Sequence, residues 1–346
     1  MAGKYITRYE RSRIEEMLKD KLRPCEIAQK LGRHFTTIYR EINMGTVTLL
    51  NSDLTERQEY CADAAQRIAM ERQSVKGRDL KIGSDFELAH HIEYLIGELH
   101  YSPYAVVQDI RKSGRFKTDI CEATLYSYID KGIFLNISNK NLYSKKNKRK
   151  QVHHEVTTKR TSYKLKGKSI EERPKEVYNR DTYGHWEMDT VYSGKDTSKC
   201  CLLVLTERMT RDEYILKMFD RTLNSTVNTI NRLEKVLGHE EFCRRFKTIT
   251  VDNGSEFSDP SLIETSCIHP DKQRTELYFC HPGSSCERAS NENANKLIRH
   301  WVPKGDDIGK HDDEHIQFIQ DWVNNYPRKL FGGLSTNEYK AALGIS

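Results

Sequence analysis

The sequence lacks any long hydrophobic run, and this absence excludes a membrane-spanning protein. The longest apolar stretch covers residues 200–205, whereas a transmembrane helix needs about 20 apolar residues. Arg, Lys and Glu occur throughout residues 1–18, so we expect no secretory signal peptide. The expectation is therefore a cytoplasmic protein whose nine cysteines are reduced.

The sequence also lacks a Cys-x-x-Cys pair, the short spacing that is typical of structural zinc sites. A looser group in the C-terminal half leaves zinc binding open as a minor alternative. Its members are Cys267, His269, Cys280, His281 and Cys286. Because Cys280 and His281 continue a strand pattern, we favour packing over zinc for this group.

Net positive charge is confined to one short window. The whole chain carries a formal charge of +6, whereas residues 144–168 hold ten Lys or Arg against the single acid Glu155, or +9, which leaves −3 for the rest. Basic blocks are typically extended and commonly bind nucleic acid, although a solvated linker is the alternative. The candidate DNA contacts in this basic linker are Lys145, Lys146, Lys148, Arg149 and Lys150.

The N-terminal residues show a helix-turn-helix pattern. Helices are predicted at residues 7–20 and 35–42, and between them Pro24 suits a first helical turn while Gly32 suits a tight turn. The polar residues on and before the last helix are the candidate contacts to the major groove. They are Arg33, His34, Thr36, Thr37, Tyr39 and Arg40. A plain helical bundle with a basic face is the alternative.

A second helical region follows. Residues 58–72 are rich in alanine and are predicted to form a connecting helix. Further helices are predicted at residues 88–99, after the cap Ser102 and at residues 122–129. This second trihelical unit suits a structural bundle nearly as well as a second DNA-reading module.

The pattern then changes to one of strands and helices that ends in three carboxylates. Strands are predicted around Asp189, at residues 201–205 and 214–219, up to Asp252 and at residues 276–281. Helices are predicted at residues 222–237 and 290–301. This order is expected of an α/β ribonuclease H-like domain, in which the first and fourth strands are neighbours. Two strand ends and Glu292 at a helix start would then form an oxygen-rich pocket that suits Mg²⁺ or Mn²⁺.

These segments resemble the insertion sequence 30 family of bacterial DDE transposases. The matching text includes Tyr-Gly-His-Trp-Glu-Met-Asp-Thr-Val at residues 183–191, Thr-Val-Asp-Asn-Gly-Ser-Glu-Phe at 250–257 and Cys-Glu-Arg-Ala-Ser-Asn-Glu-Asn-Ala-Asn at 286–295. Shorter matches lie at residues 279–282, 297–299, 303–305 and 325–329, and the helix-turn-helix pattern also agrees. The resemblance therefore covers nearly the whole chain.

The resemblance implies a multidomain protein whose N-terminal all-α helix-turn-helix modules precede an α/β ribonuclease H-like, retroviral integrase-type catalytic domain. Expected boundaries are 1–48 for the first DNA-binding domain, 49–100 for a helical connector, 101–143 for a second helix-turn-helix-like domain, 144–178 for the basic linker, 179–308 for the catalytic domain and 309–346 for a C-terminal helical segment.

The resemblance also implies the chemistry. Asp189, Asp252 and Glu292 become the catalytic and metal-binding triad, with two Mg²⁺ or Mn²⁺ ions per active site. Cleavage at the element ends exposes a 3′-OH, which then attacks another phosphodiester. The partners are double-stranded DNA, as terminal inverted repeats and target, and further copies of the chain in a dimer or larger oligomer. The protein would be cytoplasmic, associated with the nucleoid when bound to DNA, and without contact to a membrane.

Several neighbours of the triad are candidates for supporting roles. Glu187, Glu256 and Glu287 compete as ligands but are assigned support, with Glu256 expected to hold the turn after Asp252. The amides expected to orient the site or the phosphate are Asn253, Asn291, Asn293 and Asn295, and the cations expected to meet the DNA backbone are Lys296 and Arg299.

The chain departs from the family at Met188, Gly283, Cys286 and Ala289, and in a longer segment before Glu292. The surplus falls in residues 259–274, which we expect to be a surface insertion. Two rival functions stay open: a structure-selective nuclease of the same fold that cuts without strand transfer, and a DNA-binding regulator without chemistry.

Overall fold

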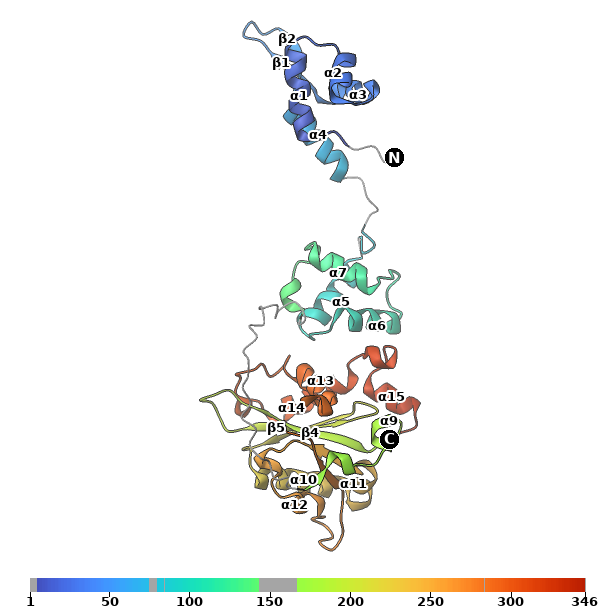
Figure 1. The fold of residues 1–346 in the computed structure, drawn as a ribbon, viewed down its shortest axis with the longest axis vertical. Coiled ribbons are helices and arrows are strands. Elements are labelled where there is room, and N and C mark those ends of the chain that lie inside the picture. Colours follow the sequence, from blue (N-terminus) through green and yellow to red (C-terminus); the bar gives the residue numbers. More distant parts are fainter. Residues whose placement is uncertain (1–4, 75–79, 84, 143–166, 283, 346) are drawn as a thin grey trace. The chain divides into compact units, whose positions relative to one another are not determined.

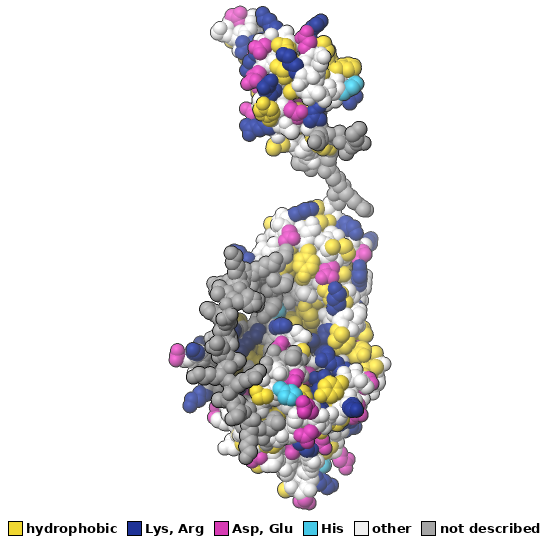
Figure 2. All heavy atoms as spheres, in the orientation of Figure 1, with side chains coloured by type: hydrophobic (Ala, Val, Ile, Leu, Met, Phe, Trp, Pro, Cys, Tyr) yellow, Lys and Arg dark blue, Asp and Glu magenta, His cyan; other side chains and the backbone are white. Residues whose placement is uncertain are grey.

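The computed structural model describes residues 5–74, 80–83, 85–142, 167–282 and 284–345. Contacts divide the chain into two compact units, residues 1–83 and 84–346. The predicted DNA contacts between Lys145 and Lys150 lie outside the described residues. Over the visible face of the described residues, Lys and Arg side chains are interspersed with Asp and Glu (Figure 2).

The N-terminal unit begins with the three predicted helices. These are α1 (Arg8–Lys19), α2 (Pro24–Leu31) and α3 (Phe35–Gly45). Thr7 and Glu10 form a capping box at the start of α1, and Gly32 adopts the left-handed conformation (φ 62°) that ends α2. Ile14, Ile27 and Ile38, one from each helix, are fully buried against one another. The helix-turn-helix arrangement is therefore confirmed.

A β-hairpin replaces the beginning of the predicted connecting helix. Strand β1 (Thr46–Leu50) pairs antiparallel with β2 (Glu56–Tyr60), and only then does α4 (Ala62–Ser74) begin. The prediction of a helix from residue 58 was therefore wrong for residues 58–60. The reason is that most side chains of β2 are exposed, so the strand carries no alternation of apolar residues that sequence patterns could reveal.

The second unit opens with three helices, α5 (Phe86–Gly97), α6 (Pro103–Ser113) and α7 (Glu122–Asp130). Ser102 caps α6 as predicted, and its backbone N–H donates to the Tyr326 hydroxyl at 3.0 Å. The indole N–H of Trp322 donates to the Leu99 carbonyl at 2.9 Å. The connection between α5 and α6 therefore contacts the C-terminal part of the chain directly.

A six-stranded mixed sheet forms the centre of the second unit. Its strands are β3 (Lys168–Ser169), β4 (His185–Tyr192), β5 (Cys201–Glu207), β6 (Glu213–Met218), β7 (Thr248–Val251) and β8 (Glu276–Phe279). They lie in the order β3-β8-β7-β4-β5-β6, where β5 is antiparallel to both β4 and β6, and β7 is parallel to both β4 and β8. The predicted side-by-side placement of the strands before Asp189 and Asp252 is confirmed.

Helices cover both faces of this sheet (Figure 1). On one face α10 (Leu223–Leu237), α11 (His239–Arg245) and α12 (Pro260–Glu264) pack against Trp186 and Met188 of β4. On the other face α13 (Ala289–Ile298) and α14 (Asp313–Asn325) pack against Val191 of the same strand. Because side chains alternate along a strand, Asp189 lies on the face of α13.

The remaining elements are short. They are α9 (Glu176–Asn179), α15 (Thr336–Ala342) and the 3₁₀ turns η1 (Asn139–Asn141), η2 (Ile170–Glu172), η3 (Ser255–Phe257), η4 (Ser285–Arg288), η5 (Ile308–Lys310) and η6 (Lys329–Phe331). Among the residues that the structure describes, no helix is both long enough and apolar enough to span a membrane.

The segment 259–274 is not the simple surface insertion that the sequence suggested. Ile263 is fully buried in the core beneath α10, and Arg274 is only 2% exposed. The guanidinium of Arg274 contacts Glu234 of α10 at 2.9 Å, with both side chains buried. The prediction was wrong because this long-range ion pair fastens the segment to the domain, and no local pattern reveals such a pair.

Candidate active site and nucleic-acid interface

Asp189 and Asp252 lie close together at neighbouring strands of the sheet. Asp189 is on β4 and Asp252 directly follows β7, which pairs with β4 in parallel. Arg288, from η4, reaches both: its Nη1 lies 3.2 Å from Asp189 Oδ1 and its Nη2 lies 3.0 Å from Asp252 Oδ2. One guanidinium therefore spans the two carboxylates.

The charges at this point favour a cation between the aspartates. Burial alone would lower the pKa of Arg288, but attraction to Asp189 and Asp252 raises its pKa overall. The two aspartate side chains are 25% and 35% exposed, so the site opens to solvent. Sequence reasoning missed Arg288, although it lies within the segment whose resemblance was noted, just before the first turn of α13.

Helix α13 supplies the amides of the site. The Asn295 side-chain amide donates to Asp189 Oδ2 at 3.0 Å, which places this predicted residue directly beside the first aspartate. Asn291 is buried, and Thr206 of β5 donates to its side-chain oxygen. Asn293 is exposed and accepts a hydrogen bond from Lys296 at 3.2 Å.

Glu292 lies on the first turn of α13 and is exposed. It precedes Asn295 by three residues, and this spacing places both on one side of the helix. Within the described ranges, no three His, Cys, Asp or Glu side chains are arranged to hold a metal ion. The structure thus brings Asp189 and Asp252 together without closing a three-carboxylate group around Glu292.

Glu187, on β4, holds the first turn of α13 in place. Its carboxylate is fully buried, forms an ion pair with Arg208 and accepts the backbone N–H of Asn291 at 3.0 Å. The negative charge of Glu187 therefore sits at the first turn of α13, where the helix dipole favours an acid. Glu287, the third competitor, instead accepts hydrogen bonds from the His281 backbone N–H at 2.9 Å and lies 2.8 Å from its ring Nδ1.

Glu256 lies against the turn that follows Asp252. It accepts hydrogen bonds from Thr190 at 2.9 Å and from Arg221 at 2.6 Å, while its Oε2 is buried with no hydrogen-bond partner among the described residues. A Cβ at Gly254 would lie 2.5 Å from this Oε2 and 2.9 Å from Asp252 Oδ1, so only glycine permits the close approach. Asn253 secures the same turn by donating to the Cys280 carbonyl at 2.8 Å.

The two cations predicted on α13 differ in their surroundings. Lys296 is exposed and donates to Asn293 on its own helix. Arg299, by contrast, donates to the carbonyls of Val302 at 3.3 Å and Tyr192 at 3.3 Å. The guanidinium of Arg299 thus holds the end of α13 to the end of β4.

The described members of the Cys/His group have separate partners. Cys267 donates to the Asn231 carbonyl at 3.5 Å, and the His269 ring packs edge-on against His239 at 5.0 Å. Cys280 is buried at the end of β8, and His281 pairs with Glu287.

The candidate DNA contacts of the N-terminal unit surround α3. Arg33 forms an ion pair with Glu10 at 2.9 Å, and His34 caps the helix by accepting from the Thr36 backbone N–H. Tyr39 is 58% exposed and Arg40 is exposed too, which leaves both side chains free of the core.

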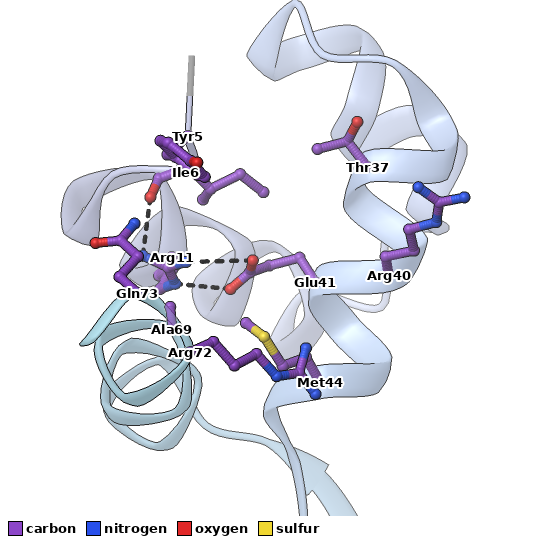
Figure 3. A pocket seen from close by; sticks show the side chains of 10 residues that line it. All are labelled: Tyr5, Ile6, Arg11, Thr37, Arg40, Glu41, Met44, Ala69, Arg72 and Gln73. Atoms are coloured by element: carbon purple, nitrogen blue, oxygen red, sulfur yellow. Dashed lines mark hydrogen bonds and ion pairs between the residues drawn. The ribbon is translucent and has the colours of Figure 1, made fainter. Parts of the chain in front are cut away.

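Thr37 and Arg40 also line a cavity of ≈470 Å³ between α3, α1 and α4 (Figure 3). At its base Arg11 contacts Glu41 at 2.7 Å, and both side chains are 7% exposed. Arg72 of α4 adds a further cation to the lining. The buried pair fixes α3 against α1, and the remaining cations give this rim positive charge.

Comparisons with known proteins agree with one another. A family model described as a helix-turn-helix domain matches residues 2–43. The chain is 31% identical over 336 residues to a probable transposase for the insertion-like sequence element IS1161 of Streptococcus salivarius, covering 95% of this chain and 92% of that protein. It is 28% identical to the transposase of IS4351 from Bacteroides fragilis, covering 97% and 95% respectively.

A more distant relative is the transposase InsI for IS30C of Escherichia coli K12, 26% identical over 94% of this chain and 80% of that protein. Among solved structures, a chain of the simian T-cell lymphotropic virus intasome in complex with PP2A regulatory subunit B56 gamma matches at 13% identity. That match covers 45% of this chain and 53% of the other, with a TM-score of 0.33.

Proposed function

We propose that this chain, which belongs to the insertion sequence 30 family of bacterial transposases, cuts DNA at the ends of its own element and joins these ends to new DNA. The observation that carries the proposal is the pair Asp189 and Asp252 on adjacent parallel strands, close enough for one guanidinium to contact both.

The catalytic domain is proposed to be ribonuclease H-like. Three antiparallel strands followed by two parallel ones, with helices on both faces, support this assignment. The first of these strands, β4, carries Asp189, and the fourth, β7, leads to Asp252. The proposed fold thus accounts for why two residues far apart in sequence share one edge of the site.

The residues proposed to hold Mg²⁺ or Mn²⁺, two ions per active site, are Asp189, Asp252 and Glu292. The fit is supported by the donor set, because hard carboxylate oxygens suit these ions, and by the positive charge that both aspartates already accept from Arg288. Bound ions of this kind activate an attacking hydroxyl and stabilise a leaving oxygen in phosphodiester chemistry.

The protein's own residues prepare this site. Asn295 holds one oxygen of Asp189, so the other faces Asp252 and Arg288. The buried Glu187 fixes the first turn of α13, the turn that carries Glu292. The site is therefore built on the sheet and one helix, which keeps its carboxylates at defined positions.

The N-terminal unit is proposed to bind the terminal inverted repeats through α3, using Arg33, His34, Thr36, Thr37, Tyr39 and Arg40. The basic residues between Lys145 and Lys150, together with Lys296 and Arg299, are proposed to contact DNA backbone. The proposed assembly is a dimer or larger oligomer that pairs two element ends, in the bacterial cytoplasm.

The test uses the full chain and a plasmid that carries the DNA flanking its gene, incubated with Mg²⁺. Strand cleavage at the element ends and joining of pre-cut ends to a second plasmid are measured. The variant Asp189→Ala should abolish both products while repeat binding is retained, and Asp271→Ala, an exposed aspartate in the same domain, should behave like the unchanged protein.

Metal-dependent cleavage by Asp189→Ala would overturn the assignment of the site. Cleavage without joining by the unchanged protein would favour the structure-selective nuclease. Binding without either product would favour the DNA-binding regulator.

A further inference from the structure

A second cavity lies beside the catalytic helix, and the proposed chemistry gives it no role. It has a volume of ≈600 Å³ and is formed where α13 meets the start of α6 and η6. Its lining consists of Ser102, Tyr104, Arg211, Ser290, Asn293, Leu297, Tyr326, Pro327, Arg328, Lys329 and Leu330. The cavity is thus built from four separate parts of the second unit.

Three of the lining residues are cations. Arg211 donates to the Ser290 hydroxyl, Arg328 donates to the Val323 carbonyl at 3.3 Å, and Lys329 lies 5.7 Å from the centre of the Tyr104 ring. Among the described residues, none of these three cations has a carboxylate within ion-pair distance. An unbalanced group of cations is an anion-binding surface.

The electrostatic setting strengthens this point. Burial, followed by the neighbouring cation Arg180, lowers the pKa of Arg211 to about 10. The carboxyls of Glu213 and Asp212 attract Arg328. Burial raises the pKa of Glu213 well above its ordinary value and so favours its neutral form, and Asp212 is paired with Lys340 at 2.5 Å. The cavity therefore carries net positive charge that an anion would relieve.

The other part of the lining is apolar. Tyr104 presents an aromatic ring, Leu297 and Pro327 add aliphatic surface, and Leu330 is 66% exposed at the rim. A cavity lined both by aromatic and aliphatic side chains and by cations matches a nucleotide, whose base is flat and apolar and whose phosphate is anionic. Inorganic phosphate alone would leave the apolar wall without a partner.

The position of the cavity connects it with the active site. Ser290 and Asn293 line the cavity, while Asn295 of the same helix contacts Asp189. Because both sets of residues belong to α13, a DNA strand that passes the aspartates runs beside the same helix and can place a neighbouring nucleotide in the cavity.

We infer that this cavity binds one unpaired nucleotide of the DNA strand next to the bond that is cut. The base packs against Tyr104 and Leu297, and its phosphate lies among Arg211, Arg328 and Lys329. The inference rests on the proposed function, since it takes DNA to be the substrate. Extrusion of that nucleotide would hold the strand at a fixed distance from Asp189.

The first experiment uses thymidine 3′,5′-bisphosphate as the probe, with the full chain and without added metal. Calorimetry should show that this probe binds about tenfold more tightly than thymidine or inorganic phosphate, because only the bisphosphate contacts both the apolar side chains and the cations of the cavity. Lys329→Ala and Tyr104→Ala should each weaken binding about tenfold. Tyr104→Phe keeps the ring and should retain binding.

Two exposed residues of the same unit serve as matched controls. Lys235→Ala removes a cation from α10, and Tyr94→Ala removes an aromatic side chain from α5. Neither change should alter binding of the bisphosphate. The inference is wrong if the probe binds no more tightly than phosphate, or if the cavity variants bind it as well as the two controls do.

A second experiment separates this inference from the proposed function. Duplex DNA with two unpaired nucleotides at one end is compared with the blunt duplex of the same sequence, again without metal. The unchanged protein and Asp189→Ala should both prefer the unpaired end, and Lys329→Ala should lose that preference. Equal binding of both duplexes by the unchanged protein would refute the inference, whereas absence of DNA cleavage would refute only the proposed function.

Discussion

Arg288 holds Asp252 with a guanidinium nitrogen 3.0 Å from the carboxylate oxygen, and its other nitrogen reaches Asp189. The side chain thereby takes up oxygens that the proposed divalent ion would require. Arg288 and the ion must compete for the two aspartates, so ion entry requires the guanidinium to withdraw.

Replacing Arg288 by alanine is therefore expected to raise the affinity of the protein for Mn²⁺. We expect an increase of about tenfold, the effect of removing one competing charge-assisted contact. Free Mn²⁺ can be measured by electron paramagnetic resonance in the absence of DNA. Arg244→Ala, which removes an exposed arginine paired with Glu241, is the matched control. Unchanged or weaker Mn²⁺ binding by Arg288→Ala would contradict the competition.

Asn295→Ala is expected to slow DNA cleavage by about tenfold, because Asp189 loses the hydrogen bond that orients it. Binding of the repeat DNA should not change. The exposed Asn337 of α15, whose side chain donates to Asn325 at 2.9 Å, offers the control Asn337→Ala. The prediction fails if the two variants cleave at the same rate.

The buried ion pair of Arg274 with Glu234 should be sensitive to the loss of one partner. Arg274→Met takes the guanidinium away from a buried carboxylate and is expected to lower the free energy of unfolding by about 3–5 kcal/mol. The double variant Arg274→Met with Glu234→Leu should recover part of that loss. Urea denaturation measures both, and Arg8→Ala, from a pair exposed by 76% and 82%, should change stability by less than about 1 kcal/mol.

The same carboxylate predicts a dependence of stability on pH. Burial alone would raise the pKa of Glu234, but hydrogen bonds from Ser266, the Cys267 backbone and His239 lower this pKa to about 2, against an ordinary value of 4.5. A pKa that is lower in the folded state stabilises the protein above pH 4.5, and this contribution is lost as the pH falls from 4.5 towards 2.

Glu234→Gln should therefore flatten the fall of the unfolding free energy between pH 5 and pH 2, as measured by urea denaturation at a series of pH values. Exposed Glu240 on the neighbouring helix provides the control Glu240→Gln. An equally steep fall in Glu234→Gln and in the control would show that other carboxylates cause it.

The parts of the fold that follow from local chemistry could be predicted. The caps at Thr7 and Ser102 and the strand that carries Asp189 have patterns that short stretches of sequence display. The hairpin at residues 46–60 could not be predicted, because its strands are largely exposed and carry no apolar alternation. Local sequence patterns also do not reveal ion pairs between residues that are far apart in the sequence.

The same division applies to the candidate site. Asp189 and Asp252 could be assigned because apolar strands lead to them, and Asn295 because it lies on the predicted helix. Arg288 could not be assigned, since only the folded chain places its guanidinium between two strands. The packing of residues 259–274 depends likewise on Arg274 meeting Glu234 across a long stretch of sequence.

The hydrogen bond from the Asn291 backbone N–H to Glu187 bears on how the segment before α13 can vary in length among related chains. Glu187 and Asp189 share strand β4, so the strand that carries the first aspartate also sets the position of α13. The length of the segment between Asp252 and α13 therefore does not determine where α13 lies relative to Asp189. That length can differ from one relative to another, while the hydrogen bond to Glu187 keeps α13 at the same position on the sheet.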